Sequence, residues 1–143
     1  MQDNLLNRIL RDLEFDRDDL DVAWKTQARK LMEYGYLSAK TEREVSDLKR
    51  ELERIEAKLY GIYRTTLSLD GARINEATIE SKVRNDPSYL TARANYDKAK
   101  ERADILKHAV NAFSHRRDMI VQASKMQLTE LERMGAEKFH KPR

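Results

Sequence analysis

The sequence predicts an all-α protein: a long antiparallel helical hairpin or coiled coil with a short N-terminal helix, which assembles into a homo-oligomer. The first reason is a row of apolar residues at alternating gaps of three and four: Val45, Leu48, Leu52, Ile55, Leu59 and Ile62. Such a row forms the seam of a coiled coil, which one helix cannot bury alone. The second reason is the composition. Charged residues make up 37% of the chain, against four glycines and two prolines, which is typical of long exposed helices.

The elements follow from capping and breaker residues. Asp86 can accept hydrogen bonds from the first N–H groups of a helix, and Pro87 fits the first helical position, so a long helix is predicted to begin there. Gly135 can end that helix. The predicted parts are one helical domain over residues 1–134, comprising an acidic N-terminal helix (1–15), a first long helix (19–63), a loop and short helix (64–86) and a long oligomerisation helix (87–134), and then a basic flexible tail (135–143).

The composition also limits the function. The absence of cysteines excludes disulfides and thiolate metal sites and fits an intracellular protein. No apolar run is long enough to span a membrane, so we expect a cytoplasmic protein. The sequence has no glycine-rich phosphate loop, nucleophile elbow or His-Glu zinc pair. His108 and His115 lie about 10 Å apart along a helix, too far to share one ion. We therefore expect no cofactor, no metal and no enzymatic activity.

Net charge is unevenly distributed along the chain. Residues 1–21 carry a net charge of −4, and the remaining residues carry +7. An acidic arm on a basic body can dock a partner or mask the body itself. An ordinary solvated helix end explains the pattern equally well.

Basic and aromatic residues gather where the first long helix meets the loop. Cations neutralise phosphates, and exposed rings stack on unpaired bases, which is how proteins hold single strands without sequence preference. The alternative is that Lys58 is an ordinary solvated residue and that the tyrosines pad the core. The candidate DNA-binding residues are Arg54, Lys58, Tyr60, Tyr63, Arg64 and Arg73.

The second long helix carries an apolar stripe that widens in its middle, which indicates contact with more than one neighbouring helix. Arg117 falls in the apolar register between Phe113 and Ile120. It could make an intersubunit salt bridge, face the lumen of an assembly, or extend its charge to water. The candidate oligomerisation residues are Leu106, Val110, Phe113, Arg117 and Ile120.

The order of these elements forms a recognisable pattern. A short acidic helix leads into a charged arm that ends in basic and tyrosine residues; a loop, a small helix, an Asp-Pro restart and a long C-terminal helix follow. Over roughly Leu10 to Gln127 this pattern resembles the UvsY family, the recombination mediators of T-even and related phages. Members of that family place basic residues, paired aromatics and a glycine at the end of the arm. Here the aromatics are split around Gly61, so only Lys58 and Arg64 carry over residue by residue.

The resemblance implies a function. Family members are small helical proteins that form a ring-like homo-oligomer through their C-terminal segment. They bind single-stranded DNA, contact the single-strand binding protein and a RecA-like recombinase, and help to load the recombinase in the cytoplasm of an infected bacterial host. They are not enzymes. We therefore expect a recombination mediator; the alternative is a coiled-coil scaffold or adaptor protein with no nucleic-acid role.

Overall fold

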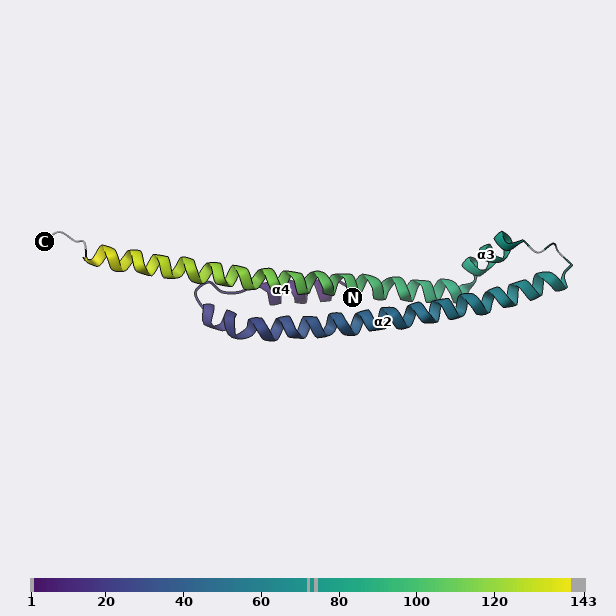
Figure 1. The fold of residues 1–143 in the computed structure, drawn as a ribbon, viewed down its shortest axis with the longest axis horizontal. Helices are drawn as coiled ribbons and strands as arrows, with labels where there is room; N and C mark the ends of the chain where they lie inside the picture. Colours follow the sequence, from purple (N-terminus) through teal and green to yellow (C-terminus); the bar gives the residue numbers. More distant parts are fainter. Residues whose placement is uncertain (1, 72, 74, 140–143) are drawn as a thin grey trace. The chain divides into compact units, whose positions relative to one another are not determined.

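The computed structural model describes residues 2–71, 73 and 75–139, which contain four α-helices and no strand (Figure 1). The all-α class predicted from the sequence is confirmed. The chain divides into two compact units. The first contains the residues up to 38 together with those from 105 onward, and the second contains residues 39–104. In chain order the helices are α1 (Gln2–Leu13), α2 (Leu20–Leu69), α3 (Glu76–Asn85) and α4 (Pro87–Phe139).

The core of the first unit forms where α1 packs against the beginning of α2 and the middle of α4. Ile9, Tyr34 and Phe113 are buried there together with Leu106 and Ala109. The ring of Tyr34 stacks on that of Phe113 with 4.7 Å between centroids. Its hydroxyl donates a hydrogen bond of 2.6 Å to Asp12 on α1. Tyr34 therefore joins all three helices of this unit.

A buried arginine ties the same helices together. Arg116 is 3% exposed. Its guanidinium donates to the carbonyl of Leu13 at 3.1 Å and to the side-chain oxygen of Gln27 at 2.6 Å. Gln27 in turn donates to the carbonyl of Phe113 at 2.7 Å. Because Leu13 is the last residue of α1, Arg116 satisfies a carbonyl that the end of the helix leaves without a partner.

The second unit contains the later part of α2, all of α3 and the beginning of α4. Leu59 of α2 is buried against Ile79 and Val83 of α3. Asn75 caps α3, since its side chain accepts a hydrogen bond from the N–H of Ala77. On α4 the buried positions are occupied by Ala99 and Ala103, whose small side chains leave room for a neighbouring helix to approach.

The first long helix continues six residues past its predicted end at Tyr63. The hydroxyls of Thr65 and Thr66 bond to carbonyls four residues earlier, and Leu67 packs against the cluster formed with α3. Tertiary packing thus extends the helix through residues of low helix propensity. The chain turns at Gly71, whose φ of 68° is left-handed and suits a residue without a Cβ.

The last helix also differs from the prediction at its end. It begins at Pro87, where the sequence predicts the restart, and Asp86 accepts a hydrogen bond of 2.8 Å from the N–H of Ser88. It passes through Gly135 without a left-handed residue and continues to Phe139, so residues 135–139 are helical rather than a flexible tail. Residues 140–143 of the predicted tail lie outside the described residues. Among the helices described here, none combines the length and apolar character needed to cross a membrane.

Candidate nucleic-acid interface

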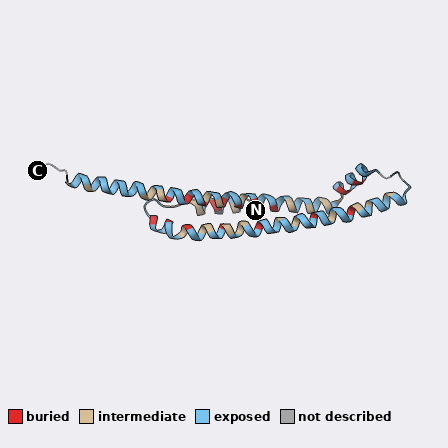
Figure 2. Cartoon of the chain, in the orientation of Figure 1, coloured by how far each residue is buried: buried red, intermediate tan, exposed pale blue. Residues whose placement is uncertain are grey.

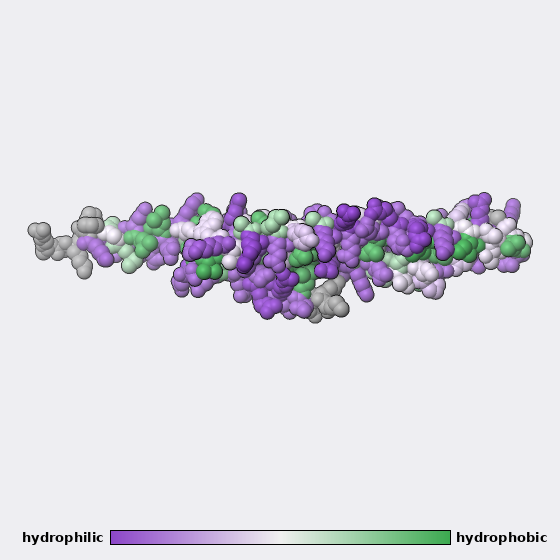
Figure 3. All heavy atoms as spheres, turned by 90° about the horizontal axis from the view of Figure 1, so that it is seen from below, coloured by the Kyte–Doolittle hydropathy of each residue, from purple (hydrophilic) through white to green (hydrophobic). Residues whose placement is uncertain are grey.

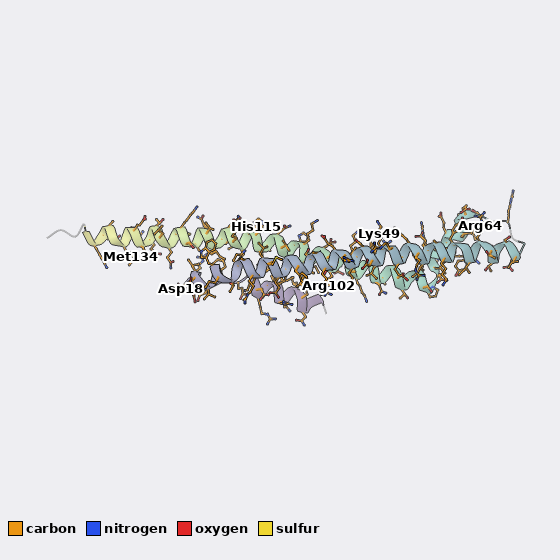
Figure 4. All side chains as sticks on the ribbon, turned by 60° about the horizontal axis from the view of Figure 1, so that its bottom comes forward. Asp18, Lys49, Arg64, Arg102, His115 and Met134 are labelled. Atoms are coloured by element: carbon orange, nitrogen blue, oxygen red, sulfur yellow. The ribbon has the colours of Figure 1, made fainter. Side chains whose placement is uncertain are left out.

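The predicted DNA-binding residues lie in the second unit, on the last third of α2 and in the connection that follows it. Five of them project from α2, and Arg73 lies between α2 and α3. Figure 4 labels Arg64 on this part of α2. The sequence-adjacent helix α3 packs against the same segment. The geometry of α3 therefore decides which of these side chains remain available to a ligand.

The hydroxyls of the two tyrosines form hydrogen bonds with α3 and with the residue that follows it. The hydroxyl of Tyr60 donates to Glu76, and that of Tyr63 donates to Asp86 at 2.7 Å. These hydrogen bonds raise the pKa of both tyrosines, and the bond from Tyr63 lowers the pKa of Asp86. Both rings are partly buried against the cluster of Leu59 and α3. The two rings therefore fill space between α2 and α3. This agrees with the alternative interpretation of the sequence, in which the tyrosines are packing residues.

The cations differ in how freely they can meet a phosphate. Arg54 donates two hydrogen bonds to Glu51, at 2.7 and 3.0 Å. Lys58, Arg64 and Arg73 are exposed, and none of them takes part in a salt bridge within the described ranges. They are the three predicted residues whose positive charge is available without breaking an intrachain ion pair.

Two cations of α3, Lys82 and Arg84, add to this set; both are exposed and lie in its last turn. Neither is among the candidate DNA-binding residues predicted from the sequence. Over residues 58–86 the chain carries five cations against four carboxylates, so the local net charge is only +1. The net attraction that one copy of this segment offers to a polyanion is therefore small.

The predicted oligomerisation residues are mostly covered by the same chain. Leu106, Phe113 and Ile120 are each 0% exposed, and Val110 packs against the core of the first unit. Arg117 is exposed and donates a hydrogen bond of 3.3 Å to Asp118. The arginine in the apolar register is therefore Arg116, not Arg117. An intersubunit contact through Leu106 or Phe113 would require that α1 or α2 move away.

The C-terminal third of α4 has a different surface. Figure 2 shows this part of α4 almost entirely exposed, and Figure 3 shows hydrophobic side chains among its hydrophilic ones. Leu131 lies eleven residues after Ile120, which is three helical turns, and so it continues the face that Ile120 buries. The large apolar side chains exposed here are Met126, Leu128, Leu131 and Met134, at 53–61%.

The described residues contain no group of three or more His, Asp or Glu side chains placed to hold a metal ion. His108 and His115 are both exposed.

Comparison with solved structures gives a match that covers most of the chain. The chain is similar to the crystal structure of the recombination mediator protein UvsY of bacteriophage T4, with a TM-score of 0.60 and 19% sequence identity. The similarity covers 91% of this chain and 98% of the other.

The chain has the fold of UvsY. The resemblance drawn from the order of elements is thus confirmed as a likeness of fold, and it extends over nearly the whole of both chains. No protein-family model matches the sequence, and no curated protein is similar to it at a significant level. At 19% identity the similarity to UvsY is visible in the fold rather than in shared motifs.

Proposed function

We propose that the protein is a recombination mediator that binds single-stranded DNA and helps to load a RecA-like recombinase onto it in phage recombination and repair. The observation that carries this proposal is the agreement in fold with UvsY, described as a recombination mediator, over 91% of this chain and 98% of that one. Because one fold can serve several functions, the proposal also needs support from particular residues.

That support comes from the unpaired cations of the second unit. Lys58, Arg64 and Arg73 keep their charges free, and Lys82 and Arg84 of α3 are exposed nearby in the sequence. We call these five residues the basic tip. In the proposal they contact phosphates and release counterions from the strand. Tyr60 and Tyr63 contribute indirectly, by holding α3 in place through Glu76 and Asp86.

Tight binding requires several copies, so the proposal includes a ring-like homo-oligomer. Its hub is the long C-terminal helix, as predicted. Since Leu106, Phe113 and Ile120 are buried within one chain, we place the intersubunit contact on the uncovered continuation of their face, around Leu128 and Leu131. Several basic tips then act on one strand, and individually weak contacts add up through effective concentration.

In this mechanism the two long helices form an antiparallel hairpin that presents the basic tip. The oligomer holds a strand in an open conformation while the recombinase nucleates on it and the single-strand binding protein is displaced. Contacts with both of these proteins belong to the proposal, as does action in the cytoplasm of an infected bacterial host. The protein itself carries out no chemical step.

The second candidate is a coiled-coil scaffold or adaptor. The exposed apolar residues on α4 favour it, because they indicate a protein-binding surface whether or not DNA is bound. A scaffold would bind DNA weakly and equally at all its basic positions, whereas a mediator would depend on the basic tip.

Charge reversal separates the two candidates. We expect Lys58→Glu with Arg64→Glu to weaken single-strand binding by at least about tenfold, since contacts to phosphates dominate such affinities. Recombinase loading onto strands coated with single-strand binding protein should fall in parallel, and the oligomer mass should not change.

The matched control is Arg43→Glu with Lys49→Glu. These residues are also exposed on α2 in the second unit, are also outside the described salt bridges, and change the net charge by the same amount. Equal losses in both double variants would contradict the proposed site and favour a nonspecific basic surface.

A further inference from the structure

One face of α2 in the first unit is directed toward neither α1 nor α4. Lys30 and Tyr34 form the hydrogen bonds of α2 to α1, and Trp24 and Gln27 form those to α4. The remaining face carries four exposed side chains at spacings of four, three and four residues: Lys25, Arg29, Met32 and Tyr36. Positions with this spacing lie within about 60° of one another around a helix. They therefore form one continuous surface.

Tyr36 has the most accessible ring of the six tyrosines. It is 61% exposed, whereas Tyr34 is buried and the other four are half-buried. Among the residues that the structure describes, the Tyr36 hydroxyl has no hydrogen-bond partner, and no second ring or guanidinium lies over its ring. Met32 lies one turn earlier and is 71% exposed. The ring of Tyr36 is thus free to stack on a planar group of a ligand.

The charge that remains unpaired on this face is positive. Arg29 is exposed and takes part in no salt bridge within the described part of the chain. α2 carries two carboxylates in the first unit, and both are paired: Asp21 with Lys25 at 2.9 Å, and Glu33 with Arg8 of α1. A ligand that offers both anionic groups and flat rings therefore matches this face better than an apolar partner does.

We propose that Tyr36 stacks on a base of a single-stranded nucleic acid while Arg29 contacts a phosphate of the same short stretch of strand. The two residues lie about 10 Å apart along the helix, and Met32 between them supplies apolar contact. Aromatic rings beside cations hold single strands through stacking and charge together. Tyr36 thus takes the role that the sequence predicts for Tyr60 and Tyr63, whose rings pack against α3.

The inference rests on the proposed binding of single strands and adds a stacking residue to it. Tyr36 belongs to the first unit, whereas the basic tip belongs to the second. The two contribute in different ways. The basic tip acts on phosphates, so its contribution falls as salt is added, whereas the contribution of Tyr36 requires a base on which the ring can stack. A strand that lacks bases therefore separates the two.

The test compares the affinities of Tyr36→Ala and wild-type protein for an oligothymidylate and for an abasic oligonucleotide of the same length. We expect Tyr36→Ala to bind the oligothymidylate at least about fivefold more weakly and the abasic strand within about twofold of the wild type. Tyr36→Phe keeps the ring and should bind both strands as the wild type does. Arg29→Ala should weaken binding of both strands alike, because it removes a phosphate contact.

The matched control is Met119→Ala, because Met119 is 58% exposed and belongs to the first unit but lies on α4. It should leave both affinities unchanged. Equal losses on the two strands in Tyr36→Ala would overturn the proposal, and so would no loss on either, including the case in which only recombinase loading falls and the face binds a protein. If Lys58→Glu with Arg64→Glu still weakened binding, the mediator role would stand without this site. A wild-type protein that binds no strand would overturn both.

Discussion

Arg116 holds the interior of the first unit together through neutral acceptors rather than through a salt bridge. Its guanidinium reaches the carbonyls of Leu13 and Glu14 and the side chain of Gln27, and it lies over the ring of Phe15. Burial lowers its pKa from the usual arginine value. Removal of such a group would leave several acceptors buried without a donor, which costs more than the bonds themselves contribute.

We expect Arg116→Ala to lower the free energy of unfolding by about 2–4 kcal/mol, measured by urea denaturation. The neighbouring variant Arg117→Ala is the control. Since Arg117 is exposed, its loss should change the free energy of unfolding by less than about 0.5 kcal/mol. Equal effects of the two variants would contradict the assigned network.

Sequence alone could not choose between these two arginines. Position 116 lies three residues after Phe113 and position 117 lies four after it, and both spacings fit a helix face. The choice depends on where the end of α1 presents its carbonyls, about a hundred residues away in sequence. The tyrosines pose the same difficulty. Tyr60 and Tyr63 stand among cations, as in a stacking site, but their partners Glu76 and Asp86 are 16 and 23 residues distant.

Tyr34 gives a prediction about alkaline pH. Burial, and then the hydrogen bond to Asp12, raise its pKa above the ordinary value of 10.0. A raised pKa in the folded state means that the protonated phenol stabilises the fold. This stabilisation is complete below pH 10 and is lost as the pH rises further.

In a titration followed by tyrosinate absorbance, we expect Tyr34 to ionise last among the six tyrosines and together with unfolding. The variant Tyr34→Phe should lose that last step. If the last step persisted in this variant, the buried Tyr34 phenol would not be its source.

At the scale of elements, α3 is held by two buried side chains, Ile79 and Val83, of which Ile79 is the larger. Ile79 is 0% exposed and lies against Leu59 and Val83. We expect Ile79→Ala to loosen α3, because truncation of a buried isoleucine typically costs about 2–5 kcal/mol. Hydrogen exchange should become faster in the amides of residues 76–85 and remain slow in the first unit.

Leu69→Ala provides the comparison, since Leu69 is 82% exposed and its truncation should leave the exchange of α3 unchanged. Uniformly faster exchange across α1 and α4 in Ile79→Ala would show instead that α3 is not a separate structural element.

The existence of the long helices could be predicted from periodicity, but their ends could not. α2 passes Tyr63 because Leu67 gains a packing partner on α3, a contact that no local pattern reveals. α4 passes Gly135 because a glycine inside a helix costs only about 1 kcal/mol and does not by itself stop one. Asp86 and Pro87 acted as predicted because a cap and a first-turn proline are local features.

At the scale of the whole molecule, the order of elements was sufficient to predict the fold, which agrees with UvsY although only 19% of residues are identical. The division between intrachain and intersubunit contacts was not predictable in the same way. A wide apolar stripe indicates several neighbours but not which of them belong to the same chain. Leu106 and Phe113 pack against α1 and α2 of the same chain, Ile120 is buried within the chain, and Leu128 and Leu131 are exposed.

The measurement we would make first is fluorescence anisotropy of labelled single-stranded and duplex oligonucleotides across a salt series, with the protein mass determined in the same buffers. We predict that an oligomer binds the single strand in preference to the duplex. The slope of the logarithm of the binding constant against the logarithm of the salt concentration should become shallower by about 0.7 for each phosphate contact removed from the basic tip. A well-folded oligomer that binds no single strand at low salt would contradict the mediator role and leave the scaffold as the better explanation.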